Sequence, residues 1–178
     1  MYGNCCYLIM ESLNLKRTMY LTEDEIRDNA KVILGFDEKD PNVKQGTGQI
    51  TTFNQLGFKG VSDKPDGWYL PNDKQDIAII LETKSEKEDV FSEKHYAELV
   101  KNIEIAALQY KRVVGILYNG TDVRVIKYIK GSEQYEEIAD VAKTLQNKRY
   151  YIALFKENRI NKQLIYSLTK KINDCLHV

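Results

Sequence analysis

Apolar residues recur at helical spacing in two stretches of the chain. The first follows a Thr-x-x-Glu capping box that begins at Thr22, and it predicts a helix over 22–34 that Gly35 ends. The second has apolar residues three and four positions apart and predicts a helix over 92–110. The helical pattern is absent from the segment between them.

That segment contains a predicted hairpin. Residues 66–70 form a short strand candidate, residues 71–75 supply Pro, Asn and Asp for a turn, and residues 77–81 are unbroken apolar. A short run rich in Ile is typical of a strand that is covered on both faces in the middle of a sheet. The two strands should therefore pair as a hairpin.

A second hairpin is predicted after the second helix. Residues 113–118 are apolar, Asn119-Gly120 is the strongest signal for a two-residue turn, and residues 123–128 alternate between apolar and polar. The order helix, hairpin, helix, hairpin predicts an α/β fold with a central mixed β-sheet flanked by helices.

The remaining segments are less regular. We expect a loop over 37–49, and short edge strands are candidates at 49–53 and near Phe58. Beyond Gly131 the chain is predicted to be mostly helical, and 150–155 suits a strand or a helix equally well.

A length of 178 residues suits one domain of ordinary size. We divide it into an N-terminal arm (1–21), a core (22–130) and a helical C-terminal extension (131–178). A packed arm, a short strand and a disordered lead-in are all open for the first segment. The last predicted helix, 161–178, has no stop signal.

Charge and apolar content exclude some functions. The 26 basic residues balance 26 acidic ones, so the chain cannot bind nucleic acid or an anionic membrane through bulk electrostatics. Contact with DNA or RNA requires a local basic patch or a partner domain. Since no segment approaches about 18 apolar residues, we expect no membrane span.

Cysteine and histidine offer no metal site. The three cysteines lack paired zinc-binding spacing and fit a reducing, cytoplasmic environment. His95 and His177 are far apart, and each is better explained as a surface or helix-end residue than as a ligand.

Candidate chemistry lies at one end of the first hairpin. Antiparallel pairing sets Asp66 beside Glu82, close enough to share a divalent cation, and Lys84 lies on the same strand face as Glu82. Carboxylate oxygens are ligands that Mg²⁺ prefers, and the Thr83 backbone carbonyl is a further candidate. A solvated ion pair between Asp66 and Lys84 is the structural alternative.

Such groups suit phosphodiester hydrolysis. A metal ion lowers the pKa of a bound water and offsets charge on the phosphate, and an adjacent ammonium orients the water or stabilises the developing charge. The apolar strand before Glu82 makes a solvated surface pair the less favoured reading, because a carboxylate at a buried margin is costly without a partner.

These residues resemble a known family. Pro65-Asp66, fifteen intervening residues and Glu82-Thr83-Lys84 match the PD-(D/E)XK nucleases. Over 22–130 the chain is most similar to the N-terminal nuclease domain of type I restriction subunits and of fused type IIG restriction–methylation enzymes. The resemblance implies a restriction-endonuclease-like fold and a Mg²⁺-dependent DNA endonuclease, with Mn²⁺ able to substitute.

In this family Asp66 and Glu82 would bind the metal, and Lys84 would assist the attacking water. The implied partners are double-stranded DNA and a methylase, translocase or specificity domain or subunit. The predicted helix 161–178 resembles the segment that joins the nuclease to a downstream methylase domain in fused enzymes, so we expect the chain to be the amino-terminal piece of a longer protein. An acid four residues before an Arg often adds a third carboxylate, which here is Glu23 before Arg27; the alternative is that Glu23 only stabilises the helix N-terminus.

The second helix departs from the family pattern. Many relatives carry a Gln and a Tyr four residues apart there, whereas this chain has adjacent Gln109 and Tyr110. Gln109 is a candidate contact for the DNA backbone, and a helix-end contact with solvent is favoured over it. Trp68 is expected to pack in the core in preference to stacking on a base, and the charged run 84–93 is expected to be a solvated loop.

Two further functions stay open. The first is a non-catalytic DNA-contact or docking module that retains the nuclease fold. The second is an RNA or repair nuclease, because the fold serves several substrates and nothing in the sequence selects or excludes a 2′-hydroxyl.

Overall fold

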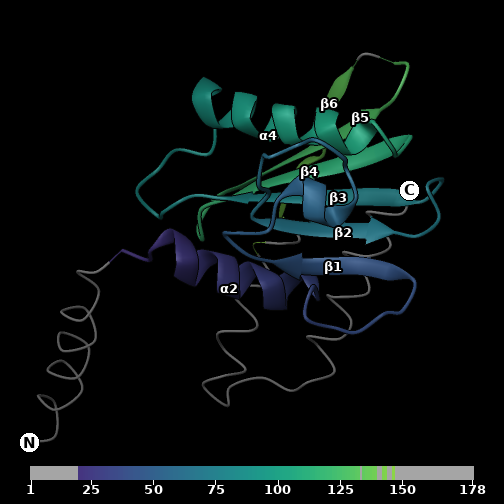
Figure 1. The fold of residues 1–178 in the computed structure, drawn as a ribbon. Coiled ribbons are helices and arrows are strands. Elements are labelled where there is room, and N and C mark those ends of the chain that lie inside the picture. Colours follow the sequence, from purple (N-terminus) through teal and green to yellow (C-terminus); the bar gives the residue numbers. More distant parts are fainter. Residues whose placement is uncertain (1–19, 133, 140–141, 144–145, 147–178) are drawn as a thin grey trace, which may run out of the picture.

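A six-stranded mixed sheet lies between two helices, α2 (Glu23–Leu34) and α4 (Glu93–Ala107), which cover its opposite faces (Figure 1). The structure is a computed structural model, and it describes residues 20–132, 134–139, 142–143 and 146. The predicted α/β class, with a mixed sheet flanked by helices, is confirmed.

The strands lie in the sheet in the order in which they occur in the chain. They are β1 (Val43–Thr47), β2 (Gly67–Pro71), β3 (Ile77–Thr83), β4 (Arg112–Tyr118), β5 (Val123–Ile129) and β6 (Tyr135–Glu137). Only β3 and β4 pair in parallel among these strands, and the other neighbours are antiparallel. A parallel pair needs a crossover, and α4 supplies it.

The first helix matches its prediction. The Thr22 side chain accepts a hydrogen bond from the Glu25 backbone, Glu25 caps in return, and Gly35 ends the helix with φ 72°. A left-handed residue at this position is favourable for Gly because it has no Cβ. The apolar stripe of α2 packs on the sheet through buried Ile26 and Ala30.

The β2–β3 hairpin also matches its prediction. Gly67 pairs with Leu81 and Tyr69 with Ile79, and all seven residues of β3 are buried. Side chains alternate between the two faces of a strand. Leu81 therefore packs on the α2 side and Ile80 on the α4 side, which explains the unbroken apolar run.

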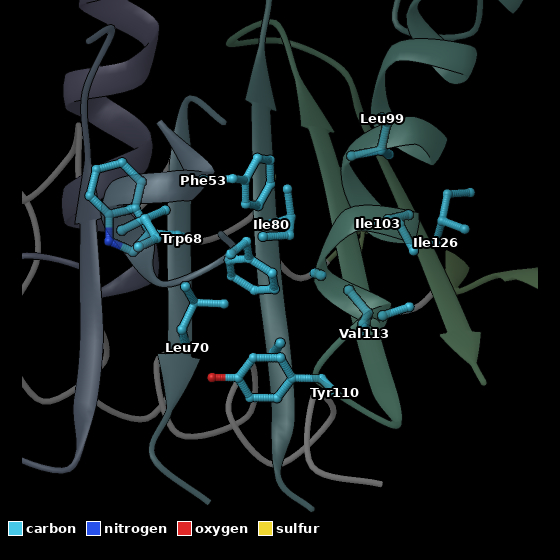
Figure 2. Close-up of a cluster of buried hydrophobic side chains, with 14 of the residues drawn as sticks. Phe53, Trp68, Leu70, Ile80, Leu99, Ile103, Tyr110, Val113 and Ile126 are labelled. Atoms are coloured by element: carbon cyan, nitrogen blue, oxygen red, sulfur yellow. The ribbon is translucent and has the colours of Figure 1, made fainter. Parts of the chain in front are cut away.

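Figure 2 shows the core between α4 and the sheet, where Leu99 and Ile103 of α4 point toward the strands. Trp68 is buried in this cluster, so its expected role in the core is confirmed. Gly115 of β4 lies directly beneath the helix. A Cβ added there would be 2.5 Å from Ile103 Cδ1, so the absence of a side chain lets α4 approach the sheet closely.

Three predictions for 37–58 are wrong. Val43–Thr47 is a strand within the expected loop, and it pairs along its whole length with β2. Its Gly46 is not a turn residue: a Cβ there would be 3.1 Å from the Trp68 ring, so the glycine permits close packing. Neither 49–53 nor the segment near Phe58 contains a strand. A short helix, α3 (Phe53–Leu56), follows a capping box at Thr52 instead.

The second hairpin has the predicted strands but a longer turn. Tyr118 pairs with Val123, so four residues connect the strands where we expected two. The Asn119 side chain accepts hydrogen bonds from the backbone N–H groups of Thr121 (3.0 Å) and Asp122 (2.6 Å). An Asn that bonds its own following backbone stabilises this wider turn.

The chain beyond Gly131 begins with a strand, β6, where helix was expected. β6 pairs with β5, and this long-range pairing outweighs the local pattern. The expectations for 1–19, 150–155 and 161–178 lie outside the described residues. In the described part of the chain, none of the helices combines the length and the apolar character of a membrane span.

Candidate functional site

The β2–β3 pairing sets Asp66 and Glu82 at one end of the hairpin. Gly67 pairs with Leu81, and continuing the register by one residue sets Asp66 opposite Glu82. Asp66 Oδ2 also accepts hydrogen bonds from the backbone N–H (2.7 Å) and the hydroxyl (2.9 Å) of Thr83. The predicted proximity of Asp66 to Glu82-Thr83 is therefore present.

Arg27 of α2 binds the other oxygen of Asp66. Its Nε and Nη2 lie 3.0 and 2.9 Å from Asp66 Oδ1. Arg27 is only 5% exposed, and it also contacts Glu23 (2.8 Å) and Asp24 (2.6 Å). One buried guanidinium thus joins three carboxylates from two elements, a role that the sequence interpretation did not assign to it.

Glu23 reaches the site through this arginine. Its pKa is raised chiefly by burial and secondly by the charge of Asp66, while the charges of Lys84 and Arg27 act in the opposite direction. Arg27 Nη2 contacts both Glu23 Oε1 (2.8 Å) and Asp66 Oδ1 (2.9 Å), so Glu23 lies near Asp66. The structure therefore brings Glu23 to the neighbourhood of Asp66, with Arg27 between them.

Glu82 is the most deeply buried carboxyl of the site, with 6% exposure. The Asn102 side-chain amide donates a hydrogen bond to its Oε1. Burial, reinforced by the charge of Asp66, raises the pKa of Glu82 to about 8. Lys84 opposes this shift, but its Nζ is 3.8 Å from Glu82 Oε2, which leaves the carboxylate without a close counter-ion.

Lys84 shares the α4 face of β3 with Glu82, as predicted. Its closest partner is Glu98 of α4, whose Oε2 lies 2.8 Å from Lys84 Nζ. Burial by itself lowers the pKa of Lys84, but the bond to Glu98 and the surrounding carboxylates raise it above its ordinary value. Lys84 is consequently a permanent cation, suited to stabilising charge and unsuited to accepting a proton.

His95 lies in the first turn of α4 and is buried. Its Nδ1 is 3.2 Å from Glu98 Oε2, and its Nε2 is 3.4 Å from Glu88 Oε1. The prediction of a helix-end residue is confirmed, whereas the surface alternative is wrong. His95 is only 6% exposed, and its two ring nitrogens contact Glu98 of α4 and Glu88 of the segment between β3 and α4.

Gln109 lies away from the site. It follows α4, and its side-chain amide donates to the Gly57 carbonyl (2.8 Å). β4 begins three residues later at Arg112, opposite Ile77, the end of β3 farthest from Glu82. The structure therefore does not bring Gln109 to the other predicted site residues.

The charged run after Lys84 is anchored more firmly than a solvated loop. Glu86 and Leu21 exchange two hydrogen bonds: Glu86 N donates to Leu21 O (3.2 Å), and Leu21 N donates to Glu86 Oε2 (2.9 Å). Asn119 donates to the Glu88 carbonyl (2.7 Å). The run thus connects the start of α2 to the β4–β5 turn.

Three contributing residues were missed from the sequence: Arg27, Glu98 and Asn102. Asn102 carries a usable signal, because it lies next to Ile103 within the apolar stripe of α4 and is itself buried. A polar residue on a buried helix face requires a hydrogen-bonding partner. Glu98 is half-exposed, and its sequence position gives no comparable signal.

The oxygen atoms of Asp66 and Glu82, with the Thr83 carbonyl, are the candidate metal ligands. Within the described ranges, no three Asp, Glu, His or Cys side chains form a group able to hold a metal ion. Mg²⁺ commonly binds one or two carboxylates and completes its coordination with water and substrate phosphate. A two-carboxylate site therefore fits the chemistry of that ion.

A scan against protein-family models gives no match, and searches of curated proteins and of solved structures give none either. The interpretation of the site consequently depends on its own residues, and the resemblance to PD-(D/E)XK nucleases stays a prediction.

Proposed function

We propose that residues 22–130 form a Mg²⁺-dependent DNA endonuclease domain with a restriction-endonuclease-like fold. The observation that carries the proposal is the convergence of Asp66, Glu82 and Lys84 at one end of the β2–β3 hairpin. Hydrolysis of a phosphodiester needs such groups: two carboxylates that can hold a metal ion, and a positively charged lysine beside them.

The donor set suits a divalent cation. Glu82 is buried beside Asp66, and the pKa of Glu82 is raised to about 8 because burial and the charge of Asp66 outweigh the opposing effects of Lys84 and of the Asn102 hydrogen bond. Asp66 and Glu82 would hold Mg²⁺, or Mn²⁺ in its place, with Thr83 contributing its carbonyl and Glu23 a fourth candidate. The bound ion would supply a water of lowered pKa and offset charge on the phosphate.

The protein's own residues would then orient the substrate. Lys84 presents an ammonium on the face that carries Glu82, where it stabilises negative charge on the phosphate oxygens as the water oxygen bonds to phosphorus. The attacking water releases a proton to solvent, the bond from phosphorus to the leaving oxygen breaks, and that oxygen takes up a proton from solvent. Arg27 fixes the Asp66 carboxylate from the side of α2.

Double-stranded DNA is the proposed substrate. Because the net charge is zero, we propose that a methylase, translocase or specificity domain or subunit supplies most of the DNA affinity. These partners define a restriction–modification enzyme, and three cysteines without zinc-binding spacing are compatible with a cytoplasmic one.

One observation favours the alternative of a non-catalytic docking or DNA-contact module. Both Asp66 oxygens already have partners, Arg27 on one and Thr83 on the other. A carboxylate satisfied in this way can act purely as a structural connection between α2 and the hairpin. The two functions differ in whether Glu82 binds metal.

Metal-dependent thermal unfolding of the wild type and Glu82→Gln, with a short DNA duplex present, separates them. Gln is nearly isosteric with the protonated carboxyl and can still accept the Asn102 hydrogen bond, so the variant should fold. The wild-type midpoint should rise with Mn²⁺ concentration, because a ligand that binds only the folded state stabilises it. Glu82→Gln should show no rise.

Glu104→Gln is the matched control. It removes one charge from α4 while keeping an acceptor for the Tyr135 hydroxyl, and its response to Mn²⁺ should equal that of the wild type. Equal responses in the wild type and Glu82→Gln would instead support the docking module. In a plasmid-nicking assay, Lys84→Met should retain the Mn²⁺ response and lose about 100-fold or more in cleavage rate.

A further inference from the structure

We propose that Glu98 and Asn102 of α4 are positioning residues, Glu98 for Lys84 and Asn102 for Glu82. The inference depends on the proposed function, because the two groups they hold are its catalytic and metal-binding residues. Both positioning residues come from one helix and are four positions apart, so they lie one turn from each other on the same face.

Glu98 determines where the Lys84 ammonium lies. Lys84 Nζ is 2.8 Å from Glu98 Oε2 and 3.8 Å from Glu82 Oε2, so its direct hydrogen bond goes to the helix. A lysine side chain has four rotatable bonds and loses much conformational freedom when it is held in one place. The bond to Glu98 restricts Lys84 to the position beside Glu82.

Asn102 determines the orientation of the Glu82 carboxyl. Its amide donates to Glu82 Oε1, and both side chains are buried. The other oxygen, Oε2, is the one that faces Lys84. The hydrogen bond therefore leaves Oε2 directed toward the space between Glu82 and Lys84, where the proposed chemistry occurs.

Glu98 is itself held in place. Nδ1 of buried His95 lies 3.2 Å from the same Oε2 atom that contacts Lys84, and His95 Nε2 contacts Glu88 on the preceding segment. Glu98 Oε2 thus contacts both Lys84 and His95, and buried His95 holds it independently of Lys84. This arrangement resists the rotation that a half-exposed glutamate would otherwise undergo.

The backbone of α4 is fixed by packing next to the polar pair. Leu99 and Ile103 follow Glu98 and Asn102 by one residue each, and both are fully buried against the sheet (Figure 2). Gly115 allows this close contact, as its missing side chain would overlap Ile103. The helix consequently acts as a rigid support that presents two polar side chains to β3.

The first test measures the chemical reactivity of Lys84 without metal or DNA. Wild type and Glu98→Gln are exposed to limiting acetic anhydride, and acetylation of Lys84 is followed by peptide mass spectrometry. Loss of the ion pair should raise the rate of Lys84 acetylation by about threefold or more, since an amine that Glu98 no longer holds is more accessible to the reagent. Glu104→Gln controls for the loss of charge on α4, and its Lys84 rate should equal that of the wild type.

The second test separates rate from affinity. With Mn²⁺ at saturation, Glu98→Gln should lower the single-turnover cleavage rate by about tenfold or more while leaving the Mn²⁺ dissociation constant unchanged. Asn102→Leu, which keeps the number and branching of the side-chain heavy atoms but removes the amide donor, should weaken Mn²⁺ binding by about fivefold or more and leave Lys84 acetylation unchanged. Glu98→Asp, which keeps the carboxylate, should recover part of the lost rate.

The outcomes that overturn the inference are specific. Equal Lys84 acetylation in the wild type and Glu98→Gln would exclude the role of Glu98, and equal Mn²⁺ affinity in the wild type and Asn102→Leu would exclude that of Asn102. Failure of the proposed function has a different signature: the wild type itself binds no Mn²⁺, while Glu98→Gln still changes acetylation. Glu98 would then hold a lysine that has no role in metal-dependent cleavage.

Discussion

Glu82 is the second-last residue of β3, a strand in which every residue is buried, and its carboxyl accepts a hydrogen bond from the Asn102 amide. Burial and the charge of Asp66 both favour its protonated form, which is why the pKa of Glu82 is raised to about 8. The ionised form of Glu82 is therefore unfavourable without a nearby cation, and a cation that binds there stabilises both this form and the folded protein. The residue therefore couples folding, pH and metal binding.

We predict that Glu82 gives the metal-free protein a characteristic pH dependence. The folded state binds a proton that the unfolded state releases from about pH 4.5 upward, so the free energy of unfolding should fall between about pH 5 and pH 8 and level off above it. The slope due to this residue should approach about 1.4 kcal/mol per pH unit, and Glu82→Gln should remove it. Urea denaturation in EDTA measures both curves.

The test compares the free energy of unfolding of the wild type with that of Glu82→Gln at each pH. At alkaline pH, Glu82→Gln should be more stable than the wild type by about a few kcal/mol, the amount expected from the raised pKa of Glu82. Glu104→Gln should follow the wild type throughout. Parallel curves for the wild type and Glu82→Gln would show that Glu82 titrates normally in the folded state.

Sequence reasoning located the residues of the site that a short hairpin brings together. Asp66 and Glu82 are joined by one tight connection, so strand pairing alone determines their proximity. The Arg27–Asp66 contact spans 39 residues and depends on where α2 packs against the sheet. Glu98 likewise reaches Lys84 only because α4 crosses the sheet at a particular position, which no local pattern encodes.

At the scale of elements, the approach of α4 to the sheet controls the geometry of the site. β4 is parallel to β3, and α4 joins the two and covers the face that carries Glu82 and Lys84. The contact is close at Gly115, where no side chain separates the strand from the helix. Small changes there should displace Glu98 and Asn102 from their partners.

We predict that Gly115→Ala destabilises the protein by about 1–3 kcal/mol, the usual cost of adding volume to a packed core. The new Cβ would be 2.5 Å from Ile103 Cδ1 and 3.0 Å from Leu99 Cδ1, so the helix must shift outward. Ile103→Val removes the closer of these atoms and should recover part of the loss in the double variant. Urea denaturation measures all three proteins.

Gly48→Ala is the matched control for this prediction. An added Cβ there would meet nothing nearer than 3.5 Å, so the change in stability should stay within about 0.5 kcal/mol. If Gly115→Ala were as stable as Gly48→Ala, the close approach of α4 would not be a constraint on the fold.

Helices and strands that bury a face were easier to predict from the sequence than exposed ones. Strands β3 and β4 and helices α2 and α4 have strong apolar patterns because each buries a face, and these were predicted from the sequence. β1 has an intermediate burial pattern and a mostly polar sequence, and β6 is short and largely exposed. Such edge strands are stabilised by pairing with a neighbour, so their own sequences carry a weak signal.

At the scale of the whole molecule, the proposed active site is placed on a chain with no net charge. The 26 acidic and 26 basic residues cancel, and several acidic groups surround Lys84. DNA binding to a protein is driven largely by release of counter-ions from phosphates that the protein neutralises. A domain of this composition should position a phosphate locally but contribute little to overall affinity.

We therefore predict weak DNA binding by the chain alone, with a shallow dependence on salt. In EDTA, fluorescence anisotropy with a duplex of about 20 base pairs should give a dissociation constant in the weaker part of the non-specific range, about 100 μM. The slope of the logarithm of the association constant against the logarithm of salt concentration should be smaller than about 3 in magnitude, because few phosphates are neutralised. A slope of about 6 or more would reveal a basic binding surface in this chain, and the need for a DNA-binding partner domain would then disappear.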